Sequence, residues 1–303
     1  MRIAVTGAGG FVGPWVIRDA AAHGHEAVGD RPGPDVTDAA AVAAWLDAAR
    51  PDAVVHLASE SSPRRAAADP ERALAINVGG TRNLLDAAIA MEHRPIVLIA
   101  GSVEVYGAPE HLPLTEDAPL HAASPYSLSK VGQEAAGLDA WARHSLPVVV
   151  ARSFHHTGPG QLPHFAVPGI AGRVAAVAAG LSDTLTTGNL DVARDFLDVR
   201  DVARAYRLLL EGVAAGRVPG GTVVNVCSGR SVSIRTIVEI LCRLAGVVVA
   251  PVTDPSLVRM GEPPEIRGDP SRLVALTGWA PSISLEETLA GVLHDARAHL
   301  AAR

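Results

Sequence analysis

Short, continuous apolar runs alternate along the first half of the chain with longer segments in which apolar residues recur at helical spacing. Continuous runs are typical of strands buried on both faces, and the spaced pattern is typical of amphipathic helices. The predicted strands are residues 2–6, 26–29, 53–57, 96–100 and 147–151, and the predicted helices are 11–23, 38–49, 71–92 and 125–145. Such alternation places parallel strands in one sheet with helices on both faces. We therefore predict an α/β fold built on a doubly wound parallel sheet.

The second half of the chain is less regular, and its pattern indicates a smaller lobe. The predicted elements are helices over 165–180, 198–211, 233–245 and 285–299 and a strand over 222–227. We expect residues 1–152 to form the first domain, which also takes in about 196–227. A smaller C-terminal α/β lobe then consists of 153–195 and 228–303.

Composition excludes several classes of protein. Hydrophobic residues make up 48% and charged residues 19%, whereas disordered chains are poor in apolar residues. The 26 basic and 32 acidic residues leave a net charge of −6, which argues against a nucleic-acid partner bound by bulk electrostatics. No apolar run reaches the roughly 18 residues of a membrane span, so we expect no membrane association. Cys227 and Cys242 lack disulfide or zinc spacing, which predicts no metal site and a reducing, cytoplasmic location.

A glycine-rich turn follows the first predicted strand and opens the first predicted helix. Residues 6–13 read TGAGGFVG. In such a turn one glycine makes the sharp bend, one lets the backbone approach a pyrophosphate and one packs helix on strand, while the helix N-terminus faces the phosphates. This context predicts a dinucleotide-binding domain. We assign five residues of the turn to cofactor binding: Gly7, Gly10, Phe11, Val12 and Gly13.

An acidic and a basic residue stand side by side after the second predicted strand, as Asp30 and Arg31. The aspartate suits the ribose hydroxyls of NAD(H) and the arginine suits the 2′-phosphate of NADP(H), so the form of the cofactor stays undecided. The pair is alternatively a solvated charge pair. Asp35 and Val36 follow at the expected mouth of a third strand, where Asp35 could accept from the adenine amino group. The residues after them could instead simply cap the next helix.

Tyr126 and Lys130 stand four residues apart at the start of a predicted helix and therefore share one face. Pro125 before them suits a first helical turn. A nearby ammonium favours phenolate, so we expect Lys130 to lower the pKa of Tyr126. Such a tyrosine exchanges a proton with a carbonyl oxygen. The spacing alone also occurs as a surface tyrosine beside a solvated lysine.

The strand over 96–100 ends in GSVEVYG, residues 101–107, and here the chain resembles the extended short-chain dehydrogenase/reductases. That family combines the glycine-rich turn, a Ser/Thr-x-x-V-Y-G strand end and a Y-x-x-x-K helix on a Rossmann-type sheet. The resemblance implies that Ser102 bonds the reacting oxygen, Tyr126 is the acid/base and Lys130 holds the nicotinamide ribose. Two further landmarks, HLA at 56–58 and NVGGT at 77–81, imply cofactor contacts from Leu57, Ala58 and Asn77.

The second half is similar to the GDP-mannose 4,6-dehydratases and the GDP-4-keto-6-deoxymannose reductases. The matching strings are RSFHHTGPGQ at 152–161, GNLDVARDF at 188–196 and RMGE at 259–262, followed by GD at 268–269. The chain departs from the family pattern at His155, which replaces an asparagine, and at Met260, which replaces a proline. A nucleotide-sugar substrate is implied, with the GDP-linked form favoured. Its implied ligands are His155, Asn189, Arg194, Arg259 and Glu262. An ion pair of Arg194 with Asp195 or Asp198 is the structural alternative.

Glu104 occupies the place of the dehydratase base, yet related reductases carry a glutamate there too. About four residues separate Arg31 from Asp35, whereas dehydratases resemble longer chains with a long loop at this point. We therefore favour NAD(P)H-dependent reduction of a 4-keto-6-deoxyhexose, with GDP-D-rhamnose or its C4 epimer as product. The alternatives are a 4,6-dehydratase, a 4-epimerase, a dTDP-sugar 4-ketoreductase or a non-catalytic dinucleotide sensor. By the same resemblance, segments 78–92 and 125–144 form a four-helix homodimer interface. Its apolar residues include Leu84, Leu85, Ala88 and Leu138.

Overall fold

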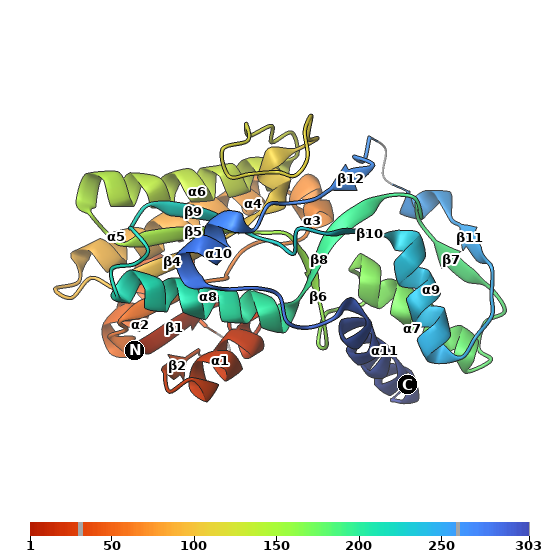
Figure 1. Ribbon diagram of the computed structural model, residues 1–303. Helices are drawn as coiled ribbons and strands as arrows, with labels where there is room; N and C mark the ends of the chain where they lie inside the picture. Colours follow the sequence, from red (N-terminus) through yellow and green to blue (C-terminus); the bar gives the residue numbers. More distant parts are fainter. Residues whose placement is uncertain (30–32, 259–260, 303) are drawn as a thin grey trace.

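The computed structural model of the protein describes residues 1–29, 33–258 and 261–302. A six-stranded sheet with the order β2-β1-β3-β4-β5-β9 forms the larger lobe, and every neighbouring pair in it is parallel (Figure 1). Its strands are β1 (Arg2–Thr6), β2 (Glu26–Val28), β3 (Ala53–His56), β4 (Ile96–Ser102), β5 (Val148–Ser153) and β9 (Thr222–Val226). The predicted doubly wound α/β fold is confirmed.

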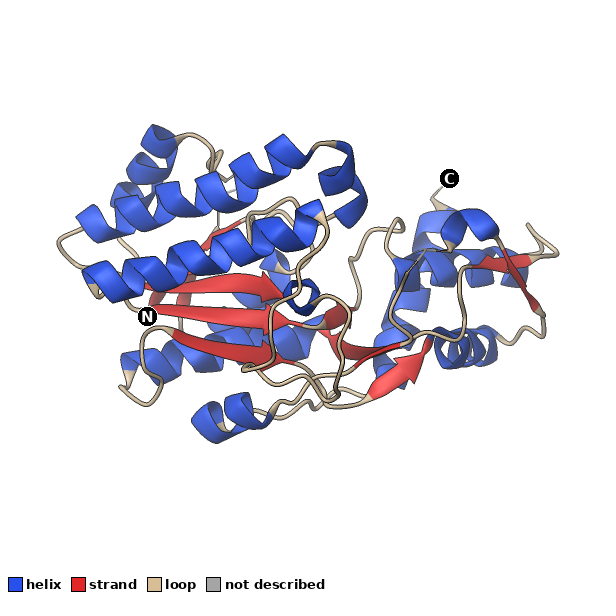
Figure 2. Cartoon of the chain, turned by 90° about the horizontal axis from the view of Figure 1, so that it is seen from above, coloured by secondary structure: helices blue, strands red, loops and turns tan. Residues whose placement is uncertain are grey.

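Helices cover both faces of this sheet because its strands are apolar on both sides (Figure 2). One apolar core lies under α1 (Gly13–Ala22), α8 (Val199–Ala214) and α10 (Ser271–Thr277). The other lies under α2 (Ala39–Ala49), α5 (Gly80–Ala90) and α6 (Pro125–His144). Three short elements pack against α6: α3 (Pro63–Ala68), α4 (Pro70–Leu74) and the π-helical turn η1 (Ala75–Gly79).

The chain changes direction across the sheet between β1 and β3. From β1 it passes to β2 on one side and then returns to β3 on the other. In open parallel sheets a crevice forms at such a switch point, beyond the carboxyl ends of the strands. The glycine-rich turn after Thr6 and the loop after His56 therefore flank the place where a ligand is expected.

The smaller lobe packs three helices and several short strands around its own apolar core. The helices α7 (Ala166–Ala178), α9 (Ile234–Ala245) and α11 (Leu285–Ala301) contact one another. The strands are β6 (His155–Thr157), β7 (Leu185–Thr187), β8 (Ala193–Asp198), β10 (Ser231–Ser233), β11 (Pro251–Thr253) and β12 (Glu265–Ile266). Two 3-10 turns complete the chain, η2 (Val103–Tyr106) after β4 and η3 (Pro255–Leu257) after β11.

Several sequence expectations need correction. The single helix expected over 71–92 is divided into α4, η1 and α5. Leu84, Leu85 and Ala88 are buried in the core of one chain, with at most 2% exposure, so they cannot contact a second copy. Their helical spacing reflects packing of α5 on the sheet.

We propose that the larger domain consists of residues 1–152 and 196–227 and that the smaller one consists of 153–195 and 228–303. The structure changes this division at one segment. Leu273 and Trp279 belong to the core of the larger lobe, under α8. Trp279 also donates its indole N–H to the carbonyl of Asp201, 3.0 Å away. The segment 271–279 therefore lies with the first domain, although the sequence pattern assigned it to the second.

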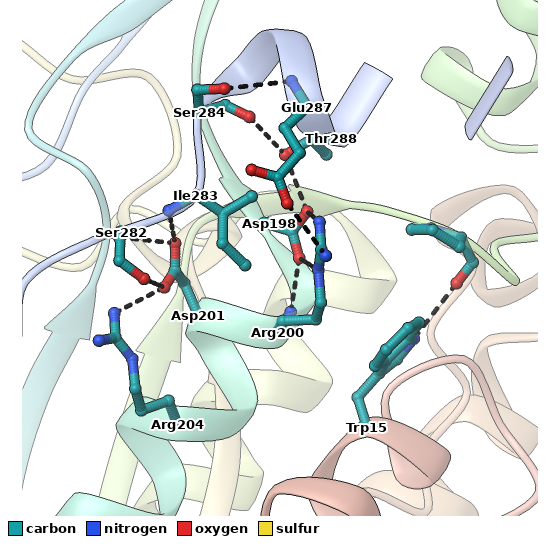
Figure 3. A network of polar contacts seen from close by, with 11 residues as sticks. Trp15, Asp198, Arg200, Asp201, Arg204, Ser282, Ile283, Ser284, Glu287 and Thr288 are labelled. Atoms are coloured by element: carbon teal, nitrogen blue, oxygen red, sulfur yellow. Dashed lines mark hydrogen bonds and ion pairs between the residues drawn. The ribbon is translucent and has the colours of Figure 1, made fainter. Parts of the chain in front are cut away.

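Two aspartates at the start of α8 bind the chain segment that runs into α11 (Figure 3). Asp198 caps α8, pairs with Arg200 and accepts from the Thr288 hydroxyl at 2.8 Å. Asp201 accepts from the backbone N–H groups of Ser282 and Ile283 at 3.0 Å each. Because β8 leads directly into α8, these bonds fasten the smaller lobe to the larger one. In the described ranges, none of the helices has the length and apolar character needed to span a bilayer.

Candidate active site

The glycine-rich turn has the backbone approach that a dinucleotide site requires. Gly7 has φ +67°, and a Cβ there would lie 2.7 Å from the Ala58 nitrogen. A Cβ on Gly13 would lie 2.5 Å from the carbonyl oxygen of Ala8. Within the described part of the chain, no side chain caps the N-terminus of α1, whose backbone N–H groups therefore suit an anion. The turn and the Leu57–Ala58 loop beside it fit a dinucleotide diphosphate.

Contacts from this turn reach the smaller lobe. The Phe11 ring stacks on His156 with centroids 6.1 Å apart and planes 4° apart. Trp15 of α1 donates its indole N–H to the carbonyl of Pro159 at 3.2 Å. The glycine-rich turn and α1 therefore contact β6 and the loop that follows it. Val12, also assigned to the cofactor, directly precedes α1 and is partly buried.

The residues predicted to hold the adenosine end are only partly described. Asp30 and Arg31 lie outside the described residues. Asp35 accepts from the backbone N–H and hydroxyl of Thr37 at 3.0 and 2.8 Å, and these bonds lower its pKa. Val36 is buried against Gly80. Asp38 caps α2, so the local turn accounts for both aspartates, and an adenine contact of Asp35 stays a prediction.

Ser102, Tyr126 and Lys130 come together where β4 ends and α6 begins. The Ser124 hydroxyl accepts from the Ser127 N–H at 3.0 Å and, with Pro125 after it, fixes the first turn of α6. Tyr126 is 8% exposed and Lys130 3%. The Lys130 Nζ atom lies 6.0 Å from the centre of the Tyr126 ring. The predicted set therefore occupies one buried place in the structure.

Burial sets the protonation of this pair. It raises the pKa of Tyr126 to about 12, an effect that a hydrogen bond with Ser102 partly opposes. It lowers the pKa of Lys130 to about 7, because burial penalises the charged form. The expectation that Lys130 lowers the pKa of Tyr126 is therefore wrong for the free protein. Desolvation outweighs the attraction of an ammonium that itself titrates near neutral pH.

Asn77 and Glu104 have roles that their spacing did not reveal. Asn77 is completely buried; its amide accepts from the Glu60 N–H at 2.7 Å and donates to the Ser129 hydroxyl at 2.8 Å. Its side chain thus positions the loop after β3, and a cofactor contact of Asn77 stays a prediction. Glu104 lies in η2 and is half-buried, and its charge contributes to the raised pKa of Tyr126.

The predicted substrate ligands are brought together only in part. Arg194 on β8 pairs with Glu262 at 2.7 Å and donates to the carbonyls of Ala193 and Pro263. The structural alternative, an ion pair of Arg194, is therefore present in the structure, with Glu262 as the partner in place of the example partners Asp195 and Asp198. His155 packs its ring on Phe196, with centroids 5.7 Å apart. Asn189 is exposed and accepts from the Asp191 N–H, and Arg259 lies outside the described residues.

The sequence interpretation missed four buried polar residues that lie behind Tyr126 and Lys130, the predicted catalytic pair. Thr6, His56, Thr81 and Gln133 are at most 1% exposed and form a continuous hydrogen-bonded row to Lys130. The available signal was the position of Gln133, three residues after Lys130 on the same helix. Lys130 is also the only lysine among the 26 basic residues of the chain. No group of three potential metal ligands occurs in the ranges that the structure describes.

Comparison with known proteins shows the family to which the chain belongs. Residues 33–292 match the family model described as GDP-mannose 4,6 dehydratase. The chain is 41% identical to the GDP-6-deoxy-D-mannose reductase of Pseudomonas aeruginosa, over 81% of this chain and 80% of that protein. It is 31% identical to the UDP-glucose 4-epimerase of Mycolicibacterium smegmatis, over 96% of each. The solved structure of RMD from Pseudomonas aeruginosa complexed with NADPH has a TM-score of 0.90 and 36% identity, covering 98% and 99% of the two chains.

The fold and site thus define an extended short-chain dehydrogenase/reductase, a class of NAD(P)-dependent enzymes that act on nucleotide sugars. More narrowly, the chain belongs to the GDP-mannose 4,6-dehydratase family.

Gly13 and Gly9 of the glycine-rich turn give a test of cofactor binding, because a side chain would meet backbone at Gly13 and open space at Gly9. Gly13→Ala places a methyl group against backbone, so NADPH affinity should fall by about tenfold or more, equivalent to about 1.4 kcal/mol. Gly9→Ala is the matched control, because no heavy atom lies within 4 Å of the added carbon. Fluorescence titration of both folded variants measures the difference. Equal affinities would show that the turn does not hold the cofactor.

Proposed function

We propose that this enzyme reduces the 4-keto group of a nucleotide-activated 4-keto-6-deoxyhexose with NADPH or NADH. GDP-4-keto-6-deoxy-D-mannose is the favoured substrate, and GDP-D-rhamnose or its C4 epimer is the product. The observation that carries this proposal is the buried set of Ser102, Tyr126 and Lys130 where β4 ends and α6 begins, in which Tyr126 is placed to donate a proton. Reduction of a ketone needs a proton donor, whereas the first step of a dehydratase or epimerase needs a base. The 41% identity to a GDP-6-deoxy-D-mannose reductase also supports a reductase.

The side chains divide the work of this reaction. A nicotinamide dinucleotide held at the glycine-rich turn would supply a hydride for the carbonyl carbon. Tyr126 donates its phenolic proton to the carbonyl oxygen, and Ser102 donates a hydrogen bond to the same oxygen while charge develops there. Lys130, when protonated, stabilises the phenolate that remains on Tyr126. Its burial at 3% exposure strengthens that attraction, because the surrounding dielectric is low.

Arg194 and Glu262 are the described residues that we assign to the nucleotide. A guanidinium suits a diphosphate because its planar fork donates two parallel hydrogen bonds. Glu262, 2.7 Å from Arg194, holds that fork in place and carries oxygens suited to ribose hydroxyls. His155, Asn189 and Arg259 remain part of the proposed substrate site on the strength of the family pattern.

A 4,6-dehydratase is the second candidate, and Glu104 favours it. This carboxylate follows Ser102 by two residues and lies close enough to Tyr126 to affect its pKa. It is therefore placed to remove or return a proton beside the reacting carbons. Such an enzyme would convert GDP-mannose without a net supply of reduced cofactor, which distinguishes it from a reductase.

An assay of the purified protein separates these reactions. GDP-4-keto-6-deoxymannose and dTDP-4-keto-6-deoxyglucose are each offered with NADPH and with NADH, and GDP-mannose is offered alone. We expect oxidation of the reduced cofactor with the GDP-linked ketone. Tyr126→Phe should lower turnover by about a hundredfold or more and leave cofactor affinity near that of the parent. Dehydration of GDP-mannose, with no ketone reduction, would contradict the proposal.

Arg194→Ala tests the nucleotide site. Loss of charge-assisted bonds should weaken GDP affinity by about tenfold to a hundredfold, at about 1.5–3 kcal/mol. Arg235→Ala is the control, since it breaks an exposed ion pair with Asp191 in the same lobe. Calorimetric titration with GDP and a melting curve are recorded for both. A lower melting temperature with unchanged GDP affinity would mean that Arg194 only supports the fold.

We also propose a cytoplasmic location, which both free thiols suit.

We further propose a homodimer that forms through the outer faces of α5 and α6. Leu128 is 53% exposed, and Ala135 is exposed seven residues later on the same face of α6. Ala135→Arg should convert a dimer into a monomer by light scattering, because it buries an unpaired charge. Ala275→Arg, on the exposed face of α10, should leave the mass unchanged. A parent protein that is already monomeric would refute the dimer.

A further inference from the structure

A row of buried polar side chains connects the catalytic lysine with the cofactor turn. From α6, the Lys130 Nζ donates to the Gln133 Oε1 at 2.8 Å and to the Ala100 carbonyl of β4 at 3.0 Å. The Gln133 amide meets Thr81 of α5 at 2.9 Å. Thr81 contacts His56 of β3 at 2.9 Å, and His56 contacts Thr6 of β1 at 2.7 Å. The row therefore crosses four elements that the sequence separates widely.

The direction of each hydrogen bond in this row follows from its ends. An ammonium only donates, so the amide oxygen of Gln133 faces Lys130 and the amide nitrogen faces Thr81. The Thr81 hydroxyl donates to the Asn77 carbonyl at 2.6 Å and thus accepts from Gln133 and from the His56 Nε2–H. His56 is then neutral and accepts from Thr6 on Nδ1, consistent with a pKa that burial and the charge of Lys130 lower to about 3.

The far end of the row supports the glycine-rich turn. The Thr6 hydroxyl, which donates to His56, accepts from the Ala58 N–H at 3.2 Å. Ala58 is the residue against which Gly7 packs. A single orientation of the Gln133 amide thus accepts a hydrogen bond from the Lys130 ammonium and donates one to Thr81, at the start of the contacts that lead to the glycine-rich turn.

We propose that Gln133 is a positioning residue, which fixes the Lys130 ammonium between two neutral oxygens and couples it to the cofactor turn through Thr81, His56 and Thr6. Two of the three N–H groups of the ammonium are donated to the protein, which leaves one for a ligand. Because the two acceptors are neutral, they orient Lys130 without holding its proton permanently. The catalytic part of this inference rests on the proposed function.

The choice of lysine at this position fits the inference. The chain uses arginine for every basic position except Lys130. An arginine side chain stays charged in proteins, whereas a buried lysine shifts its pKa readily. Lys130, with a pKa of about 7, therefore loses its proton within the working range of an enzyme. A carboxylate at position 133 would raise that pKa, and an apolar side chain would lower it.

Other titratable groups lie on α6 itself, on elements that pack against it, and on β3 and α8. The charged residues of α5, Arg82 and Asp86, are exposed. The charges of Glu104 of η2, Tyr206 of α8 and Glu60 before α3 raise the pKa of Tyr126, and the charge of Lys130 lowers that of His56 on β3. Glu60 pairs with Arg65 and is also affected by Arg72 of α4, and the buried Glu134–Arg152 pair joins α6 to β5.

Two substitutions at Gln133 test the inference with opposite signs. Gln133→Glu keeps the shape and adds a carboxylate, and Gln133→Met keeps the length and removes the acceptor. Lysine labelled at its ε carbon gives one NMR resonance in this protein, because the chain has one lysine. Relative to the parent, we expect the pKa of Lys130 to rise by about one unit or more in Gln133→Glu and to fall in Gln133→Met. Ala275→Glu adds the same charge on α10 and should leave the titration unchanged.

Turnover supplies the second readout. The alkaline limb of the pH profile for ketone reduction should move upward in Gln133→Glu and downward in Gln133→Met, because protonated Lys130 stabilises the phenolate. A purely structural Gln133 would lower the melting temperature without moving either the resonance or the limb. Identical Lys130 titrations in parent and variants would overturn the inference. A parent that reduces no ketone would refute the proposed function, while the titration would still decide the role of Gln133.

Discussion

Burial of an ammonium beside a phenol, at the junction of β4 and α6, is the constraint on which the rest of the site depends. Desolvation penalises charge on either group, so Tyr126 keeps its proton and Lys130 titrates near neutral pH. The neutral oxygens of Ala100 and Gln133 accept hydrogen bonds from the buried Lys130 ammonium and so stabilise it. They do not add a negative charge that would cancel the effect of desolvation on its pKa. The result is a phenol that stays protonated at neutral pH and a cation whose charge depends on its surroundings.

The two lobes serve this centre in different ways. Parallel strands bring the glycine-rich turn, the loop after β3 and the end of β4 to one edge of the sheet, which puts the cofactor turn beside the proton donor. The smaller lobe contributes the ion pair of buried Arg194 with half-buried Glu262, which we assign to the substrate. Asp198 and Asp201 fasten the lobes at the start of α8, and Trp15 links α1 to the segment after β6 (Figure 3). These bonds hold both halves of the proposed site in a fixed relation.

Most of the sheet could be predicted from sequence, because each of its long strands is a continuous apolar run and each helix has clear spacing. The strands of the smaller lobe could not, because runs of two or three residues such as Glu265–Ile266 carry no period. At the site, the spacing of Tyr126 and Lys130 predicted their pairing correctly. It could not predict burial, so the expected direction of the tyrosine pKa was wrong. Gln133 escaped notice because its partner Thr81 is distant in sequence and adjacent only in the fold.

The most direct test of this account is the ionisation of Tyr126 in the free protein, followed by ultraviolet absorbance of phenolate. The chain has three tyrosines, and burial raises the pKa of each of them to about 12. Comparison of the parent with Tyr126→Phe isolates the contribution of Tyr126. The account predicts that no phenolate forms around neutral pH and that the two titrations differ only in the strongly alkaline range. A phenolate that forms near neutral pH in the parent and is absent from Tyr126→Phe would contradict it.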